Sequence, residues 1–257
     1  MKGWSIFTHS VSMVLRNFEW AVRIALVPVL IGIALIFVVL SAGGQPIAMF
    51  WDEQALSDAL QSGKLGLSFV TATLIFIAVQ FWVFVAWHRL ILLEEYPTSW
   101  LPAFKGDRIL SYFGHMLLIG FLVFVLFIPL MLLVNGLIAA MGSGALVPML
   151  LVIAGYSVFV LIAMYRMLPV LPAVAIGRPL LLRESWQATS GASGTVFLVL
   201  VLLGVLQLLM QFVSGLSFAV FAPLGFVFSA FAMLAMSLVS ASVLTTFYGH
   251  YVEGRPI

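Results

Sequence analysis

Six long stretches of this chain contain almost no charged residue, and each is long enough to cross a lipid bilayer as a helix. A hydrocarbon core of about 30 Å requires about 20 residues at the helical rise of about 1.5 Å per residue. In lipid such a segment must be helical, because only a helix satisfies its backbone hydrogen bonds within one segment. The sequence therefore predicts an all-α, polytopic, single-domain membrane protein. The six predicted spans are 24–41, 67–86, 114–138, 147–164, 194–214 and 223–246.

The composition excludes most other classes of protein. Hydrophobic residues make up 64% of the chain and charged residues 8%, whereas about a quarter of the residues of a soluble domain are charged. The basic residues flank apolar runs and form no continuous stripe, so we expect no nucleic acid partner. The absence of cysteine excludes thiolate metal sites, disulfides and cysteine nucleophiles. We expect no cofactor.

The distribution of basic residues predicts how the chain is threaded through the membrane. Ten of the eleven Lys and Arg residues lie on one side of the predicted spans, and Lys64 alone lies on the other. Short loops rich in Lys and Arg stay in the cytoplasm, so both termini are predicted to be cytoplasmic. A cleaved signal peptide is the alternative for the first span, but its length and the residues that precede it favour a retained helix.

Residues 1–23 are predicted to form an amphipathic helix that lies in the headgroup layer. The apolar residues of this segment recur at spacings of three and four, which places them on one face of a helix. Polar residues occupy the opposite face, and the tryptophan is suited to anchor the helix at the membrane surface. The predicted apolar face consists of Trp4, Phe7, Val11, Val14 and Phe18.

A similar segment precedes each of the two remaining pairs of spans. Before the third span, Ser99 is predicted to cap a short helix in which Trp100 and Phe104 share a face. Before the fifth span, Pro179 is predicted to start another, with Trp186 on one side. The chain would then consist of three hairpins, each preceded by an interfacial helix. The alternative is the ordinary gathering of Trp and Arg in loops beside a bilayer.

Three loop sequences carry a resemblance to a known group: AWHR at 86–89, LPAVAIG at 171–177 and SWQATSG at 185–191. With the amphipathic start and the six spans, the chain resembles the bacterial YciC-like proteins and the membrane domain attached to some glycerophosphoryl diester phosphodiesterases. The resemblance implies a bacterial inner-membrane protein without established catalysis. The sequence contains no hydrophilic phosphodiesterase domain, so no hydrolytic activity carries over.

Residues 191–194 read GASG and resemble the Gly-x-Ser-Gly that carries the nucleophile of rhomboid proteases, which also have six spans. A serine nucleophile needs a base within hydrogen-bond reach, and in that family the last helix supplies a histidine. Here the sixth span contains no histidine, and the predicted threading puts Ser193 at the cytoplasmic surface. We therefore favour a tight turn with Ser193 as the N-cap of the fifth span.

The pair Glu94-Glu95 resembles the Glu-Glu-x-x-x-Arg of intramembrane prenyl-processing proteases, but Ser99 stands where the arginine is required. His88 and His115 have no spacing that puts two metal ligands on one helical face. The favoured interpretation is a helix exit that carries its charges in water. No catalytic residue and no metal ligand is predicted.

The predicted spans contain few polar residues, and no Asp, Glu, Lys or Arg near a midplane, where such groups usually mark proton or ion paths. Gln207 and Gln211, one turn apart, either line a polar track or hydrogen-bond to a neighbouring helix, and the second interpretation is favoured. Ser237, Ala241 and Thr245 form a stripe of small residues that suits close helix packing. The candidate polar-track residues are Gln80, Asn135, Gln207 and Gln211.

The loop between the fourth and fifth spans holds the most suggestive basic group. Its prolines predict an irregular chain in which Arg166, Arg178 and Arg183 converge near the headgroups. Arginine pairs with phosphate through two parallel hydrogen bonds, so the three are candidate contacts for an anionic lipid. An ordinary electrostatic anchor explains the same residues.

The leading hypothesis from the sequence is a non-catalytic scaffold or accessory subunit of the inner membrane. Its expected partners are membrane lipids and other membrane proteins or further copies of the chain. A permease or lipid-translocating protein that uses the polar residues of the spans is the alternative. A serine intramembrane protease centred on Ser193 is the remote one.

Overall fold

The computed structural model describes residues 2–50, 52–61 and 65–257. All regular structure in these residues is helical, as predicted, and six helices are long and apolar enough to span a membrane. Each predicted span lies within one of these helices. Lys64, the basic residue predicted on the opposite side, lies outside the described residues. The six helices are α2 (Phe18–Ala42), α4 (Leu65–Leu93), α5 (Gly106–Met141), α6 (Leu146–Met167), α9 (Ser193–Val220) and α10 (Ala222–Phe247).

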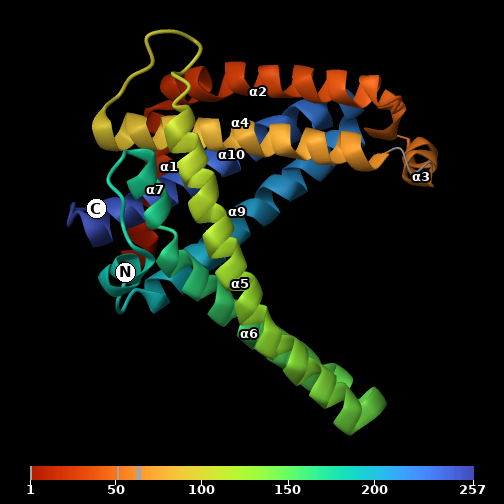
Figure 1. The fold of residues 1–257 in the computed structure, drawn as a ribbon, viewed down its shortest axis with the longest axis vertical. Coiled ribbons are helices and arrows are strands. Elements are labelled where there is room, and N and C mark those ends of the chain that lie inside the picture. Colours follow the sequence, from red (N-terminus) through yellow and green to blue (C-terminus); the bar gives the residue numbers. More distant parts are fainter. Residues whose placement is uncertain (1, 51, 62–64) are drawn as a thin grey trace.

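The six long helices form three hairpins: α2 with α4, α5 with α6, and α9 with α10. The hairpins meet at one end, where both termini lie, and the α5–α6 hairpin diverges from the other two (Figure 1). We call the end with the termini the basal end. The closing segments at the other end include η1 (Ile47–Phe50), α3 (Glu53–Gln61) and η2 (Gly142–Ala145).

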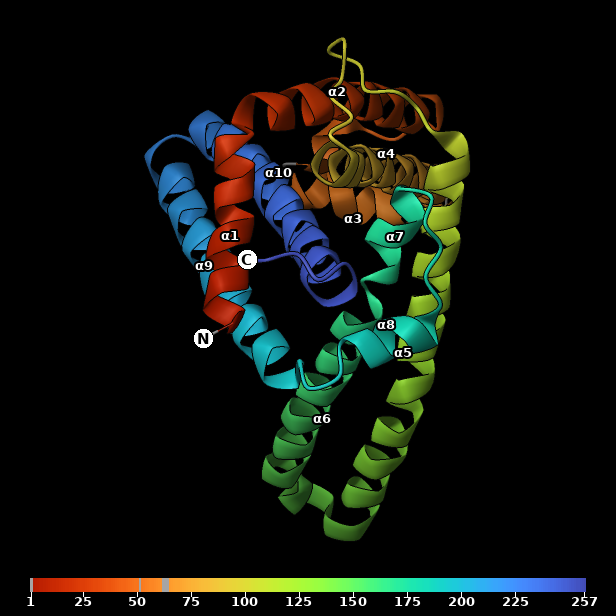
Figure 2. The ribbon, with the colours of Figure 1, turned by 90° about the vertical axis from the view of Figure 1, so that its left-hand side faces the viewer.

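The first and third hairpins pack together, and the second stands apart from them. Helix α10 contacts both α9 and α4, so it lies between them (Figure 2). The α5–α6 hairpin extends away from this bundle and touches it through α4, α9 and short helices at the basal end (Figure 2). Much of its surface is apolar and exposed, as at Phe124 and Leu132, which a lipid environment accommodates.

Four shorter helices build the basal end: α1 (Lys2–Arg16), α7 (Val170–Ala175), α8 (Leu182–Ala188) and the π-helix η3 (Tyr248–Val252). The prediction of an irregular chain between the fourth and fifth spans was wrong at α7, whereas α8 corresponds to the helix predicted before the fifth span. Pro169 and Pro172 stand at the start of α7, where the lack of an N–H costs no helical hydrogen bond. All six residues of α7 are buried, which makes it part of the protein core.

Helix α1 is amphipathic but differs from the prediction in length and orientation. It ends at Arg16, because the chain turns at Asn17, whose side chain donates a hydrogen bond to the Met13 carbonyl (2.8 Å). It packs against α9 and α10 through Gly3, Ile6, Ser10 and Val14. Trp4 and Phe18, at the ends of the predicted apolar face, are exposed on the protein surface. Residues 18–23 belong to the first span.

The predicted threefold repeat is only partly present. Residues 94–105, before α5, form no helix, because Pro102 disfavours a helical conformation at Leu101 and the Ser99 hydroxyl bonds to the Leu101 backbone in a turn. Before α9, a helix does form, but α8 starts at Leu182 and not at Pro179. A short helix therefore precedes the first and third hairpins and not the second.

Candidate functional site

A row of hydroxyl groups on α10 holds the basal end together. Ser242 accepts a hydrogen bond from the indole Nε1 of Trp87 (2.9 Å). Thr245 bonds to Nδ1 of His88 (2.8 Å), and Thr246 bonds to Ser10 of α1 (3.1 Å). All of these side chains are buried. Since buried polar groups in a membrane protein must find partners within the protein, this row fixes α10 against α4 and α1.

His88 extends the same network to the second hairpin, through the hydroxyl of Tyr112 on α5 (3.4 Å). Both side chains are buried, and their rings stack. Both imidazole nitrogens of His88 are therefore occupied by structural partners. Sequence reasoning considered His88 only as a metal ligand, and within the described part of the chain no cluster of three metal-binding side chains occurs.

The three arginines predicted to converge serve separate contacts. The Arg166 guanidinium lies 3.8 Å from the centre of the Trp186 ring and donates to the Trp186 carbonyl (2.8 Å), which holds α8 against α6. Arg178 pairs with Glu253 (3.1 Å) near the C-terminus. Arg183 is exposed on α8. Arg166 and Arg178 thus bond to different segments, α8 and the C-terminal segment, and no contact joins the three arginines among the described residues.

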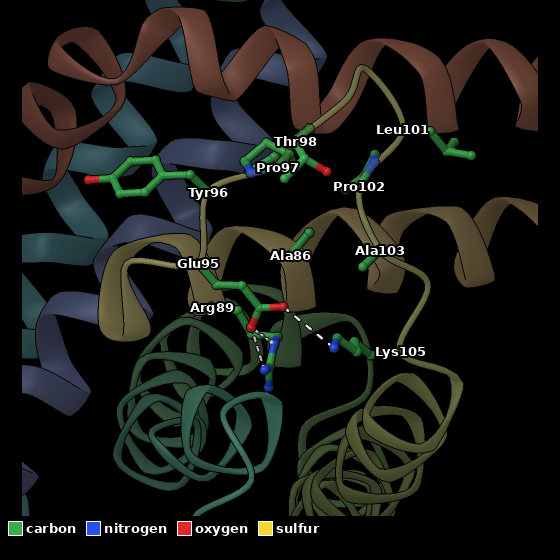
Figure 3. A pocket seen from close by; sticks show the side chains of 11 residues that line it. Ala86, Arg89, Glu95, Tyr96, Pro97, Thr98, Leu101, Pro102, Ala103 and Lys105 are labelled. Atoms are coloured by element: carbon green, nitrogen blue, oxygen red, sulfur yellow. Dashed lines mark hydrogen bonds and ion pairs between the residues drawn. The ribbon is translucent and has the colours of Figure 1, made fainter.

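A cavity of about 400 Å³ lies at the basal end, between α2, α4 and the loop that leads into α5 (Figure 3). In it the carboxylate of Glu95 lies between Arg89 and Lys105, with 3.6 Å between Lys105 Nζ and Glu95 Oε1. Arg89 also donates to the Ala175 carbonyl of α7 (3.1 Å), and only 16% of its side chain is exposed. The predicted helix exit into water thus holds for Glu94, which is exposed, while Glu95 is ion-paired.

The ion pairs of this basal cavity join α4 to the loop at 94–105, and the hydrogen bond from Arg89 to the Ala175 carbonyl adds α7. Glu95 neutralises part of the charge of two cations, which leaves the cluster with a net positive charge. No basic histidine or nucleophilic serine lines the cavity among the described residues. Its arrangement holds the loop against α4.

A second cavity, of about 490 Å³, lies within the membrane-spanning part between α4, α9 and α10, and we call it the glutamine cavity. Gln80, Gln207 and Gln211 line it together. Oε1 of Gln80 is buried and has no hydrogen-bond partner. The Ser214 and Ser229 hydroxyls bond to each other, and Ser237 and Ser240 also contribute.

The structure brings together three of the four candidate polar-track residues. Gln207 and Gln211 are exposed on the cavity wall, and no described residue forms a side-chain hydrogen bond with them. Asn135 lies elsewhere, on α5, where its side chain donates to the Met131 carbonyl (2.8 Å). Grouping Asn135 with the glutamines was wrong, because the second hairpin diverges from the other two.

Two apolar grooves adjoin the glutamine cavity. A groove of about 510 Å³ runs between the start of α2 and the middle of α9 and α10, and it shares Met210 with the cavity. A smaller one, of about 190 Å³, lies between α2, α4 and α10 and shares Gln80 and Met233 with the cavity. The space between the first and third hairpins therefore has one polar wall and two apolar extensions.

Ser193 is the first residue of α9, and the N-cap position is taken by Ala192, so the predicted serine cap was wrong. The tight turn before the helix is present, with Gly191 at a φ of 76°. His88, His115 and His250 each bond to partners other than Ser193.

The chain matches no family model, no curated protein and no solved structure.

Proposed function

We propose that the protein binds an amphipathic molecule of the bilayer between its first and third hairpins, as a lipid-translocating protein does. The observation that carries this proposal is the glutamine cavity. Amide groups at the depth of the hydrocarbon core cost several kcal/mol each when they have no partner, so about that much free energy is available to an occupant that bonds to them. The adjoining grooves would take the acyl chains of the same molecule.

None of the described residues that line the cavity is ionisable, which supports an uncoupled passage over a proton-driven pump. The proposed activity is non-catalytic. The basic residues at the basal end support a placement in a bacterial inner membrane with both termini in the cytoplasm, and the resemblance to the YciC-like group supports the same placement.

The proposal is tested by reconstitution of the purified protein into vesicles that carry fluorescent lipids in one leaflet. Movement of the label to the other leaflet should be faster than in protein-free vesicles. Replacement of all three glutamines (Gln80→Leu, Gln207→Leu, Gln211→Leu) should abolish the increase. Asn135→Leu is the matched control, since it removes a polar side chain from a span outside the cavity. A triple variant as active as the wild type would refute a role for the cavity.

The second candidate function is the scaffold or accessory subunit, and the exposed α5–α6 hairpin favours it. An isolated hairpin offers two helix faces to another membrane protein. Mass measurement in mild detergent distinguishes the two functions: a scaffold copurifies with a protein partner, and a strictly monomeric particle argues against it.

A further inference from the structure

We infer that the molecule bound in the glutamine cavity has an uncharged headgroup that carries hydroxyl groups. Diacylglycerols and neutral glycolipids share this chemistry. The inference rests on the proposed function and narrows it to one class of lipid.

The charge of the site is the first argument. No Asp, Glu, Lys, Arg or His is found among the described residues that line the cavity and its two grooves. A phosphate group there would be an anion without a counter-ion at hydrocarbon depth, which is strongly unfavourable. The basic side chains that would neutralise it lie at the basal end, where Arg89 and Arg166 are already engaged with Glu95 and Trp186.

The hydrogen-bonding capacity of the site is the second argument. The buried Oε1 of Gln80 is an acceptor without a donor. The amides open to the cavity are those of Gln207 and Gln211, and a headgroup with acceptors alone, such as a ketone or an ester, leaves their oxygens without a donor. A hydroxyl group donates one hydrogen bond and accepts others, so it can bond to the oxygen and to the NH₂ of the same amide. Gln207 and Gln211, exposed one turn apart on α9, offer two further amides of the same kind.

The shape of the site is the third argument. A cavity of about 490 Å³ holds a headgroup larger than a single hydroxyl. Its continuations share Met210 on one side and Met233 on the other, so apolar chains can leave it in two directions. Methionine side chains are flexible and adapt to chains of different shape. Two chains with one polar, uncharged head fit this arrangement.

Photo-crosslinking tests the inference. The protein is placed in phosphatidylcholine nanodiscs with photoactivatable lipids that carry the same labelled chains and differ in headgroup: diacylglycerol, glucosyl-diacylglycerol or phosphatidylglycerol. The glucosyl lipid and phosphatidylglycerol both carry hydroxyl groups. A difference in labelling between these two lipids therefore reports the effect of the phosphate charge. We expect labelling of α9 and α10 peptides by one or both neutral lipids, about tenfold stronger than by phosphatidylglycerol. The two neutral arms distinguish a diacylglycerol site from a glycolipid site.

Gln207→Leu should lower the labelling by the neutral lipid several-fold. This side chain is exposed, so the substitution leaves folding intact, and Asn135→Leu serves as the control that keeps full labelling. Equal labelling by phosphatidylglycerol, lost in Gln207→Leu, would overturn the uncharged class and leave the proposed function standing. No labelling of α9 or α10 by any of the lipids would overturn both.

Discussion

The indole Nε1 of Trp87 on α4 donates a hydrogen bond to the hydroxyl of Ser242 on α10, 155 residues later in the chain. Both side chains are fully buried, and the Ser242 hydroxyl in turn donates to the Leu238 carbonyl within its own helix. This bond, together with the one between His88 and Thr245, fixes the first hairpin to the third at the basal end. The same two hairpins form the walls of the glutamine cavity.

Trp87→Phe should lower the free energy of unfolding by about 1 kcal/mol, since it removes the donor and leaves a gap beside Ser242. Unfolding of the purified protein in detergent, followed by circular dichroism during a titration with a denaturing detergent, measures the change. Trp100→Phe, at an exposed position in the loop before α5, should have no effect. Equal losses in the two variants would contradict the structural role of the buried bond.

Glu95→Gln should lower the free energy of unfolding by about 1–2 kcal/mol, because it leaves the mostly buried Arg89 without its counter-ion. The loop at 94–105 should become more sensitive to proteolysis, since Glu95 ties it to α4. The neighbouring Glu94→Gln is the matched control, because Glu94 is exposed. Limited proteolysis with mass identification of the cut sites gives the answer. Unchanged cleavage within 94–105 would show that the ion pairs do not hold the loop.

Arg166→Lys should lower the free energy of unfolding by about 1 kcal/mol, because the planar guanidinium stacks on Trp186 and bonds to its carbonyl at the same time. An ammonium group cannot do both. Arg183→Lys makes the same charge-conserving substitution at an exposed position and should leave the free energy of unfolding unchanged. Thermal unfolding that also reports the fluorescence of Trp186 separates detachment of α8 from global unfolding. A larger effect at Arg183 would contradict the assignment.

Glycine-to-alanine substitutions at Gly3 and Gly204 should change the free energy of unfolding in opposite directions. At Gly3 an added Cβ would lie 3.0 Å from the Leu198 Cβ and from the Thr195 carbonyl oxygen, so α1 would be pushed away from α9. At Gly204, within α9, no atom lies within 4 Å of the added Cβ. Gly204→Ala should therefore raise the free energy of unfolding by about 0.5–1 kcal/mol through helix propensity, and Gly3→Ala should lower it. The same titration with a denaturing detergent measures both changes. A Gly3→Ala protein more stable than the wild type would contradict the close contact between α1 and α9.

The predicted threading can be tested directly, because the chain contains no cysteine. Gln54→Cys, on α3, and Ser190→Cys, at the basal end, both place a thiol at an exposed position. A membrane-impermeant maleimide added to intact cells should label the cysteine at position 54 and not the one at position 190. Labelling of permeabilised cells shows that both are reactive. The reverse pattern on intact cells would place the termini outside the cytoplasm.

The spans could be predicted because lipid imposes a single solution on a long apolar segment. The short helix α7 could not be predicted. Six residues are too few to show a helical period, and its prolines are typical of an irregular segment. Ser10 on α1 and Thr246 on α10 form a buried hydrogen-bonded pair. The residues around Ser10 give no indication that its partner is Thr246, and the reverse is also true. Their detection needs the packing of α1 against α10.

The candidate site shows the same limit. The sequence identifies Gln80, Gln207 and Gln211 as unusual within apolar spans, since each stands out from its surroundings. The sequence does not show which faces of α4 and α9 line the same cavity. It therefore could not distinguish the three glutamines, which line it, from Asn135, which does not. Arg166 illustrates the converse. A basic residue beside a membrane is expected to meet lipid, but the guanidinium of Arg166 on α6 instead contacts the ring of Trp186 on α8.

The second hairpin, which diverges from the other two, contains the longest helix among the described residues. With 36 residues, α5 is about 54 Å long, well beyond the roughly 30 Å of the hydrocarbon core. Its predicted apolar span, 114–138, is about 38 Å long at about 1.5 Å per residue, so we expect the helix to tilt or to thicken the membrane locally. Because the second hairpin leaves the other two at the basal end, we expect the protein to displace more lipid from one leaflet than from the other.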